Sequence, residues 1–296
     1  MATLRRLAVY LLVGVVLVWS LFPIWFFANM SLMFEIETVT VPLHFYPHNP
    51  TIINYLRMLG YSITAFVGNA TWESYKPSPF ANFMKMGMVN SAIVALGTTA
   101  LTMVIAVPVG YAFGRYKFRH KNKLLITMLY SRALPPISVV VPFAILYRIL
   151  NLTGTLAGLI IIYLSITVPI ISWVLMGYFA TLPIEAERAA RVDGCSRVQS
   201  LLRVTIPMAS AGVGTTAILT FLISWNEFLF SWLLTTGTPA ATLPAALPGI
   251  LFIANDLTGL AAMVVISIIP PLIIAMLFGR YITRLKIVDP VTTMGE

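Results

Sequence analysis

The chain has 296 residues, of which 59% are hydrophobic and only 10% are charged, so it cannot cover a water-facing surface and must lie largely in lipid. The single cysteine, Cys195, excludes an internal disulfide and a cysteine-based metal cluster. The net charge of +9 at pH 7 would suit nucleic acid, but the basic residues gather at the ends of apolar segments, which is typical of membrane topology.

Six apolar segments are each long enough to cross a bilayer, for which about 20 residues suffice. They occupy residues 7–28, 88–113, 124–149, 155–180, 207–234 and 258–281. These segments predict an all-α membrane protein with six transmembrane helices and both termini on the same side. Prolines lie within several of them, including Pro135 and Pro136. Such prolines suit either a pathway of kinked helices or ordinary packing kinks.

The amino-terminal segment, residues 1–28, is expected to be an uncleaved transmembrane anchor. Arg5 and Arg6 precede its apolar run as in a signal peptide, but the run is too long and no small-residue cleavage site clearly ends it. Residues 29–84 then form a loop on the opposite side of the membrane. Its many prolines predict an irregular segment that is too short to fold as an independent domain.

Lysine and arginine set the orientation of the predicted helices. On one side, basic residues flank the helices at Arg5, Arg6, Arg115, Lys117, Arg119, Lys121, Lys123, Arg188, Arg191, Arg197, Arg203, Arg280, Arg284 and Lys286. The other side carries only Arg57, Lys76, Lys85 and Arg148. Both termini and residues 181–207 are therefore expected to face the cytoplasm.

Residues 181–207 form a hydrophilic stretch between two apolar segments, and they contain a predicted short helix. Glu185 and Glu187 would lie at the positive end of its dipole, with Arg188 and Arg191 three and four residues further on. Gly194 suits the left-handed conformation that ends such a helix. A charged, alanine-rich helix outside the bilayer is a surface that a soluble partner could bind.

Four residues inside the predicted spans are candidates for a pathway or gate. Arg132 lies in the third span without an obvious acidic partner, so it either reaches the interface or meets another subunit. Trp225, Asn226 and Glu227 lie near the outer end of the fifth span. Trp225 suits stacking against a ligand or interfacial anchoring, while Asn226 and Glu227 suit a gate or the stabilisation of helix ends.

Residues 181–207 resemble the EAA loop of binding-protein-dependent ABC importer permeases, through Glu185, Glu187, Ala189, Ala190, Arg191, Asp193, Gly194, Ile206 and Pro207. Further motifs follow the same order: Asn90-Ser91, Tyr111 to Phe118, Pro135-Pro136 and Trp225 to Phe228. Over roughly residues 88–281 the chain is similar to the MalG-like permeases of carbohydrate-importing ABC transporters.

The resemblance implies a type I importer core over residues 85–281, with a cytoplasmic coupling loop at 181–207 and a cytoplasmic tail at 282–296. It implies a non-catalytic subunit in the plasma (inner) membrane of a prokaryote that forms half of a pathway for an oligosaccharide or disaccharide. The implied partners are a MalF-like permease, a dimer of ABC ATPases that bind ATP and Mg, and an extracytoplasmic sugar-binding protein. The chain itself would bind neither cofactor nor metal, and it lacks a nucleotide phosphate loop. The implied ATPase contacts are Glu185, Glu187, Arg188, Ala189, Ala190, Arg191, Asp193 and Gly194.

Two departures from the family pattern bear on this interpretation. Arg188 stands where these permeases usually have a glutamate, so either the partner carries a compensating acid or Glu187 makes that contact. The usual carboxyl-terminal motif is also absent. The alternatives are a permease for a non-sugar solute, a stand-alone secondary carrier, which should show charged relays and inverted repeats, and a membrane-embedded enzyme.

Overall fold

The computed structural model describes residues 2–42, 44–67, 71–251 and 256–282 of the chain. Residues 283–296, which make up nearly all of the expected cytoplasmic tail, lie outside the described residues. The chain divides into two compact units. One comprises residues 1–88 with 246–270, and the other comprises residues 89–245 with 271–296.

The first unit combines a long amino-terminal helix with short elements and part of the last helix. Its elements are α1 (Ala2–Ser31), α2 (Glu35–Val39), α3 (Ile53–Met58), β1 (Ile63–Val67), β2 (Thr71–Tyr75), the start of α4 (Ala81–Arg115), the end of α13 (Leu243–Gly249) and most of α14 (Leu257–Ile282). The strands pair antiparallel, with Ile63 opposite Tyr75. Residues 29–84 are therefore more regular than their proline content predicts, because a hairpin and two short helices form among the turns.

Buried polar contacts connect α3 to the start of α14 within this first unit. Asn54 donates a hydrogen bond of 2.9 Å to the carbonyl of Ser31 and accepts one of 3.1 Å from the Thr258 hydroxyl. Arg57 pairs with Asp256 at 3.7 Å between Nη2 and Oδ2. Because a buried polar group costs free energy unless it is paired, these contacts specify how α3 lies against α14.

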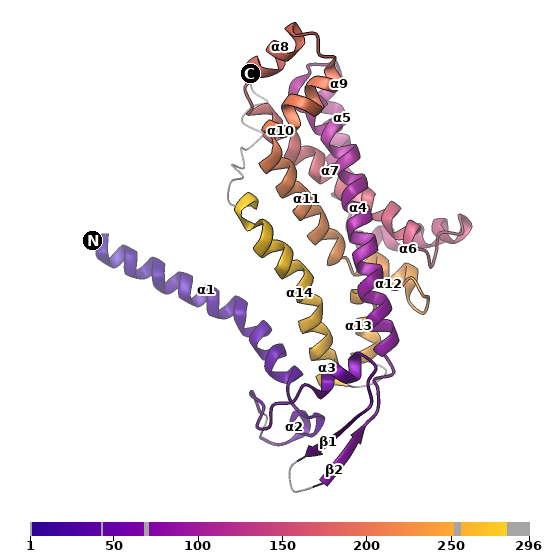
Figure 1. The fold of residues 1–296 in the computed structure, drawn as a ribbon. Coiled ribbons are helices and arrows are strands. Elements are labelled where there is room, and N and C mark those ends of the chain that lie inside the picture. Colours follow the sequence, from indigo (N-terminus) through magenta and orange to yellow (C-terminus); the bar gives the residue numbers. More distant parts are fainter. Residues whose placement is uncertain (1, 43, 68–70, 252–255, 283–296) are drawn as a thin grey trace. The chain divides into compact units, whose positions relative to one another are not determined.

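The second unit contains the remaining helices (Figure 1). They are the rest of α4, α5 (Lys121–Tyr130), α6 (Pro136–Ile149), α7 (Leu156–Ala180), α8 (Glu185–Val192), α9 (Arg197–Ser200), the π-helical turn η1 (Leu201–Thr205), α10 (Ile206–Met208), α11 (Ser210–Trp225) and α12 (Leu229–Thr235). Helix α7 is the central element, since it contacts α5, α11 and α12. Its amino terminus is capped by Thr155, whose hydroxyl accepts a hydrogen bond from the Gly158 N–H.

Helices α4 and α7 approach closely at two glycines that are one helical turn apart. A Cβ atom added at Gly110 would lie 2.7 Å from the Leu175 Cβ, and one added at Gly114 would lie 2.9 Å from the Met176 carbonyl oxygen. Small residues spaced by four let membrane helices pack backbone against backbone. The Gly110–Gly114 pair therefore sets the α4–α7 distance at the end of α4 that carries Tyr111 and Arg115.

Four described helices are long and apolar enough to cross a membrane, namely α1, α4, α7 and α14. The bent pair formed by Arg197–Met208 and Ser210–Trp225 would make a fifth candidate. Helix α6 is apolar but has only 14 residues. The protein is thus mostly helical and multi-spanning, while the count of six spans stays a prediction.

The third and fifth expected spans are both broken. The third divides into α5 and α6 at residues 131–135, because the residue before a proline avoids helical geometry and Pro136 then begins a new helix. In the fifth, the chain turns by 84° between Met208 and Ser210, and a second interruption separates α11 from α12. The break at residues 131–135 places irregular backbone within the third expected span.

Candidate functional site

Helix α8 begins at Glu185 and ends in a Schellman motif. Gly194 has a φ of +88°, the left-handed conformation expected for it. Its N–H donates to the Arg191 carbonyl at 3.2 Å, and the Cys195 N–H donates to the Ala190 carbonyl at 3.0 Å. These two bonds satisfy carbonyls that the helix end would otherwise leave free. The prediction that Gly194 ends this helix is confirmed.

The two faces of α8 have different environments. The residues expected to contact a partner divide between them. Glu187 and Ala190 are buried, whereas the exposed members are Glu185, Arg188, Ala189, Arg191, Asp193 and Gly194. Val192 is 87% exposed on the outer side. The helix thus presents Ala189 and Val192 among charged residues on its outer face and turns the Glu187 carboxylate inward.

The inward carboxylate of Glu187 is held at the end of α4. Its Oε1 lies 2.8 Å from the Arg115 Nε, and its Oε2 accepts a 3.0 Å hydrogen bond from the Tyr111 hydroxyl. Arg115 also donates through Nη1 to the Leu182 carbonyl at 2.9 Å. Both partners of the ion pair are largely buried, so the attraction between them is little screened by water. With this geometry Glu187 does not lie on the outer face of α8. It therefore does not take over the partner contact that the family's glutamate would make at position 188.

A second contact joins the first residue of α9 to the residue that directly follows α4. The guanidinium of Arg197 lies 5.2 Å from the centre of the Tyr116 ring, within the range of a cation–π contact. Arg197 also begins α9, which Ser196 and Gln199 cap reciprocally. The π-helical turn and α10 then lead into α11. Residues 181–207 are therefore attached both to α4 and, through the chain, to α11 (Figure 1).

The three candidates at the fifth span make local structural contacts. Trp225 is buried and stacks on Phe221, with ring centres 5.6 Å apart. The Asn226 side chain donates to the Leu222 carbonyl at 2.8 Å. Glu227 accepts hydrogen bonds from the backbone N–H groups of Phe230 and Ser231 at the start of α12. This geometry favours the interpretation in which Asn226 and Glu227 stabilise helix ends.

Arg132 is separate from these three residues. It lies in the break between α5 and α6 and lines a cavity of about 560 Å³ that none of Trp225, Asn226 and Glu227 lines. The structure therefore does not bring the four pathway candidates together.

Three residues important to the site escaped prediction. Tyr111 and Arg115 belong to a motif that we noted at the end of the second span, but their pairing with Glu187 was not anticipated. The helical spacing of Glu187 and Ala190, three residues apart on one face, is the signal that could have indicated an inward side. Val192 was overlooked because an exposed apolar residue becomes informative only once its surroundings are known.

Residues 106–287, more than half of the chain, match the family described as the binding-protein-dependent transport system inner membrane component. The chain belongs to that family. The permease is 29% identical over 273 residues to the sulfoquinovosyl glycerol transport system permease protein SmoH of Agrobacterium fabrum, covering 91% of this chain and 88% of the relative. It is 30% identical to the trehalose transport system permease protein SugB of Mycobacterium tuberculosis, and the match covers 72% of this chain and 78% of the relative.

A solved bacterial ABC transporter involved in the import of the acidic polysaccharide alginate has the same fold as the permease. The TM-score is 0.74 at 18% identity, covering 94% of this chain and 96% of that one. The chain is thus a MalG-like permease subunit with the type I importer fold, a multi-pass inner-membrane protein and not an enzyme. Among the described residues, no group of three or more His, Cys, Asp or Glu side chains could hold a metal ion.

Proposed function

We propose that the permease forms half of the translocation pathway of an ATP-driven sugar importer. The transported sugar would be an oligosaccharide or a disaccharide. It would pair with a MalF-like permease, receive sugar from an extracytoplasmic binding protein and couple to a dimer of ATPases that bind ATP and Mg. The sugar assignment is supported by relatives named for sulfoquinovosyl glycerol, trehalose, and trehalose and maltose. A permease for a non-sugar solute is the alternative.

The division of α8 into two faces carries the coupling proposal. The outer face presents Arg188, Ala189 and the exposed Val192, while the inner face is tied to α4 by the Glu187–Arg115 ion pair. A helix that only covered the bundle would not need an exposed apolar residue among its charges. Small and apolar residues on the outer face suit a cleft in the ATPase, and Arg188 suits an acidic group on its rim.

The attachments of α8 suggest how a movement would be transmitted. A displacement of α8 would move the end of α4 through Arg115 and Tyr111, and it would move α11 through α9 and the π-helical turn. Rigid-body shifts of packed helices are a common route between two conformations. In this proposal, closure of the ATPase dimer displaces α8 and thereby opens one side of the pathway.

The test is assembly and sugar-stimulated ATP hydrolysis with the neighbouring transport genes co-expressed. We expect an ATPase and a second permease to copurify, and a sugar delivered by the binding protein to stimulate hydrolysis. Val192→Asp should weaken copurification of the ATPase about tenfold, because it places a charge in an apolar contact. Val192→Ala is the matched control and should keep most of the binding.

Two outcomes would contradict the proposal. Uptake by this chain alone, without an ATPase, would indicate a secondary carrier. Stimulation of the assembled complex by a non-sugar solute, with no response to any sugar, would leave the coupling role intact and remove the sugar assignment.

A further inference from the structure

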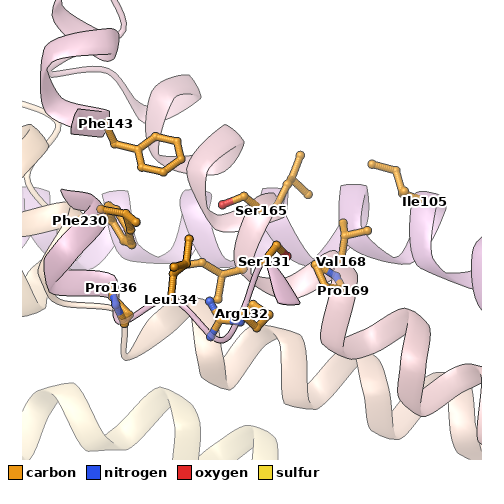
Figure 2. Close-up of a pocket in the computed structure, with 13 residues that line it drawn as sticks. Ile105, Ser131, Arg132, Leu134, Pro136, Phe143, Ser165, Val168, Pro169 and Phe230 are labelled. Atoms are coloured by element: carbon orange, nitrogen blue, oxygen red, sulfur yellow. The ribbon is translucent and has the colours of Figure 1, made fainter. Parts of the chain in front are cut away.

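The cavity beside Arg132 lies within the second unit and is walled by four parts of the chain (Figure 2). Its walls come from α4, from the break between α5 and α6 with the start of α6, from α7, and from Phe230 of α12. Its volume of about 560 Å³ is within the usual range for a small-molecule site. Ser165 and Pro169 line it near the middle of α7, so the cavity lies at the depth of the membrane core.

Arg132 is the one charged residue among the thirteen described residues that line the cavity. Its Nε is buried and has no hydrogen-bond partner among the described residues. The ion pairs in the described part of the chain join His48 to Glu37, Arg57 to Asp256 and Arg115 to Glu187, and none includes Arg132. A guanidinium does not lose its proton in a protein, so the cavity carries an uncompensated positive charge.

The local backbone adds to the preference for negative charge. Helix α6 begins at Pro136, which lines the cavity, so the positive end of its dipole lies at the cavity wall. Irregular backbone at membrane depth is tolerated where it lines a cavity, and transporters use such broken helices at substrate sites. Helix α5 ends at Tyr130, two residues before Arg132, so the negative end of its dipole favours the cation. The buried Arg132 Nε still has no hydrogen-bond acceptor among the described residues.

The remaining walls suit a sugar ring. Phe143, Pro169 and Phe230 supply apolar surface, against which the C–H face of a pyranose can lie. Ser131 and Ser165 donate their hydroxyl protons to helix carbonyls of their own segments, at 2.7 and 2.6 Å. Each hydroxyl oxygen keeps acceptor capacity for a sugar hydroxyl.

We infer that this cavity binds the carboxylate or sulfonate group of an acidic sugar, with Arg132 as the residue that selects for negative charge. The inference rests on the proposed sugar-import function and specifies its substrate class. A carboxylate or sulfonate offers two oxygens to the planar guanidinium fork, whereas a neutral sugar would leave the charge unpaired. A phospholipid head group shares this anionic chemistry, and the experiment separates the two sources.

The test uses the whole importer, reconstituted in vesicles with its partner permease, ATPase and binding protein. The probes are maltose, trehalose and cellobiose, each compared with the uronic acid obtained by oxidising one of its two primary alcohols. We expect at least one uronic acid to stimulate ATP hydrolysis at lower concentration than its neutral parent. Arg132→Gln should raise the half-saturating concentration of that acid about tenfold or more, the usual size of a lost charge-assisted hydrogen bond, without raising that of the neutral sugar.

Two further variants give the comparison its controls. Arg132→Lys keeps the positive charge but loses the planar guanidinium fork. Its half-saturating concentration for the acid should therefore lie between those of the wild type and of Arg132→Gln. Arg148→Gln removes the same charge from the exposed end of α6, outside the cavity, and should leave the preference for the acid unchanged.

Several outcomes would overturn the inference. Stimulation by neutral sugars alone, or an equal effect of Arg132→Gln on both members of a pair, would remove the anion assignment and leave the import function standing. Loss of assembly in Arg132→Gln would assign the arginine to the subunit contact. A variant effect that appears only in vesicles containing phosphatidylglycerol, and not in pure phosphatidylcholine, would assign it to lipid. Failure of every sugar to stimulate would contradict the proposed function itself.

Discussion

The role that we assign to Glu187 changes once its neighbours in the structure are known. In the sequence it is one of two acids near the start of a charged helix, and either could face a partner. In the structure its carboxylate contacts the Arg115 guanidinium and the Tyr111 hydroxyl, and it is 7% exposed. The residue that the family pattern suggests as a partner contact instead holds the helix to the bundle.

Breaking this ion pair should destabilise the attachment of α8. Glu187→Gln leaves the buried Arg115 charge unpaired, which typically costs about 3–5 kcal/mol. We expect a lower thermal unfolding midpoint for the purified complex and weaker coupling of ATP hydrolysis to transport. Thermal unfolding and the ratio of sugar transported to ATP hydrolysed would measure the two effects.

Two further variants test whether loss of the Glu187–Arg115 ion pair causes the lower unfolding midpoint. Glu185→Gln removes an exposed acid from the same helix and should change the midpoint little. The double variant Arg115→Gln/Glu187→Gln removes both charges, so it should be more stable than Glu187→Gln alone. If the double variant were destabilised relative to the wild type by the sum of the two single effects, the two residues would not be coupled.

At the scale of the elements, the contact between α4 and α7 depends on two positions without side chains. Gly110 and Gly114 allow the α7 backbone to approach, and Leu175, Met176 and Phe179 fill the surrounding space. The Gly-x-x-x-Gly spacing is visible in the sequence, but the partner helix is not. The same holds for the break between α5 and α6. Pro135-Pro136 indicates an interruption in the sequence, but the cavity that this break lines is visible only in the structure.

Enlarging Gly110 should separate α4 from α7. A leucine there would overlap with Leu175 and the Ser172 carbonyl, and overpacking of this kind costs about 1–3 kcal/mol. We expect a lower yield of folded complex and a lower unfolding midpoint. Gly14→Leu is the control, because a side chain at Gly14 of α1 would meet no atom within 4 Å. Equal losses from both variants would indicate an effect on insertion rather than on packing.

At the scale of the whole molecule, the distribution of basic residues predicts the topology. Cys195 lies in the predicted cytoplasmic loop directly after Gly194 and is partly exposed, so it is a natural reporter. A membrane-impermeant maleimide should label it in inverted membrane vesicles and leave it unlabelled in intact cells. A cysteine at the exposed Ser74, placed in a Cys195→Ser background, should give the opposite result. Labelling of both positions from one side would contradict the predicted orientation.

The sequence by itself determined that this is a multi-spanning helical membrane protein of a binding-protein-dependent transport family. Apolar length, basic-residue bias and helix-ending glycines are local properties, and each can be read from adjacent residues. Only the tertiary structure decided that Glu187 faces inward and that Arg132 lies unpaired in a cavity. Those environments depend on Tyr111, Arg115, Ser165 and Phe230, which come from other helices. Burial and pairing depend on residues far apart in the chain, so no local pattern could have determined them.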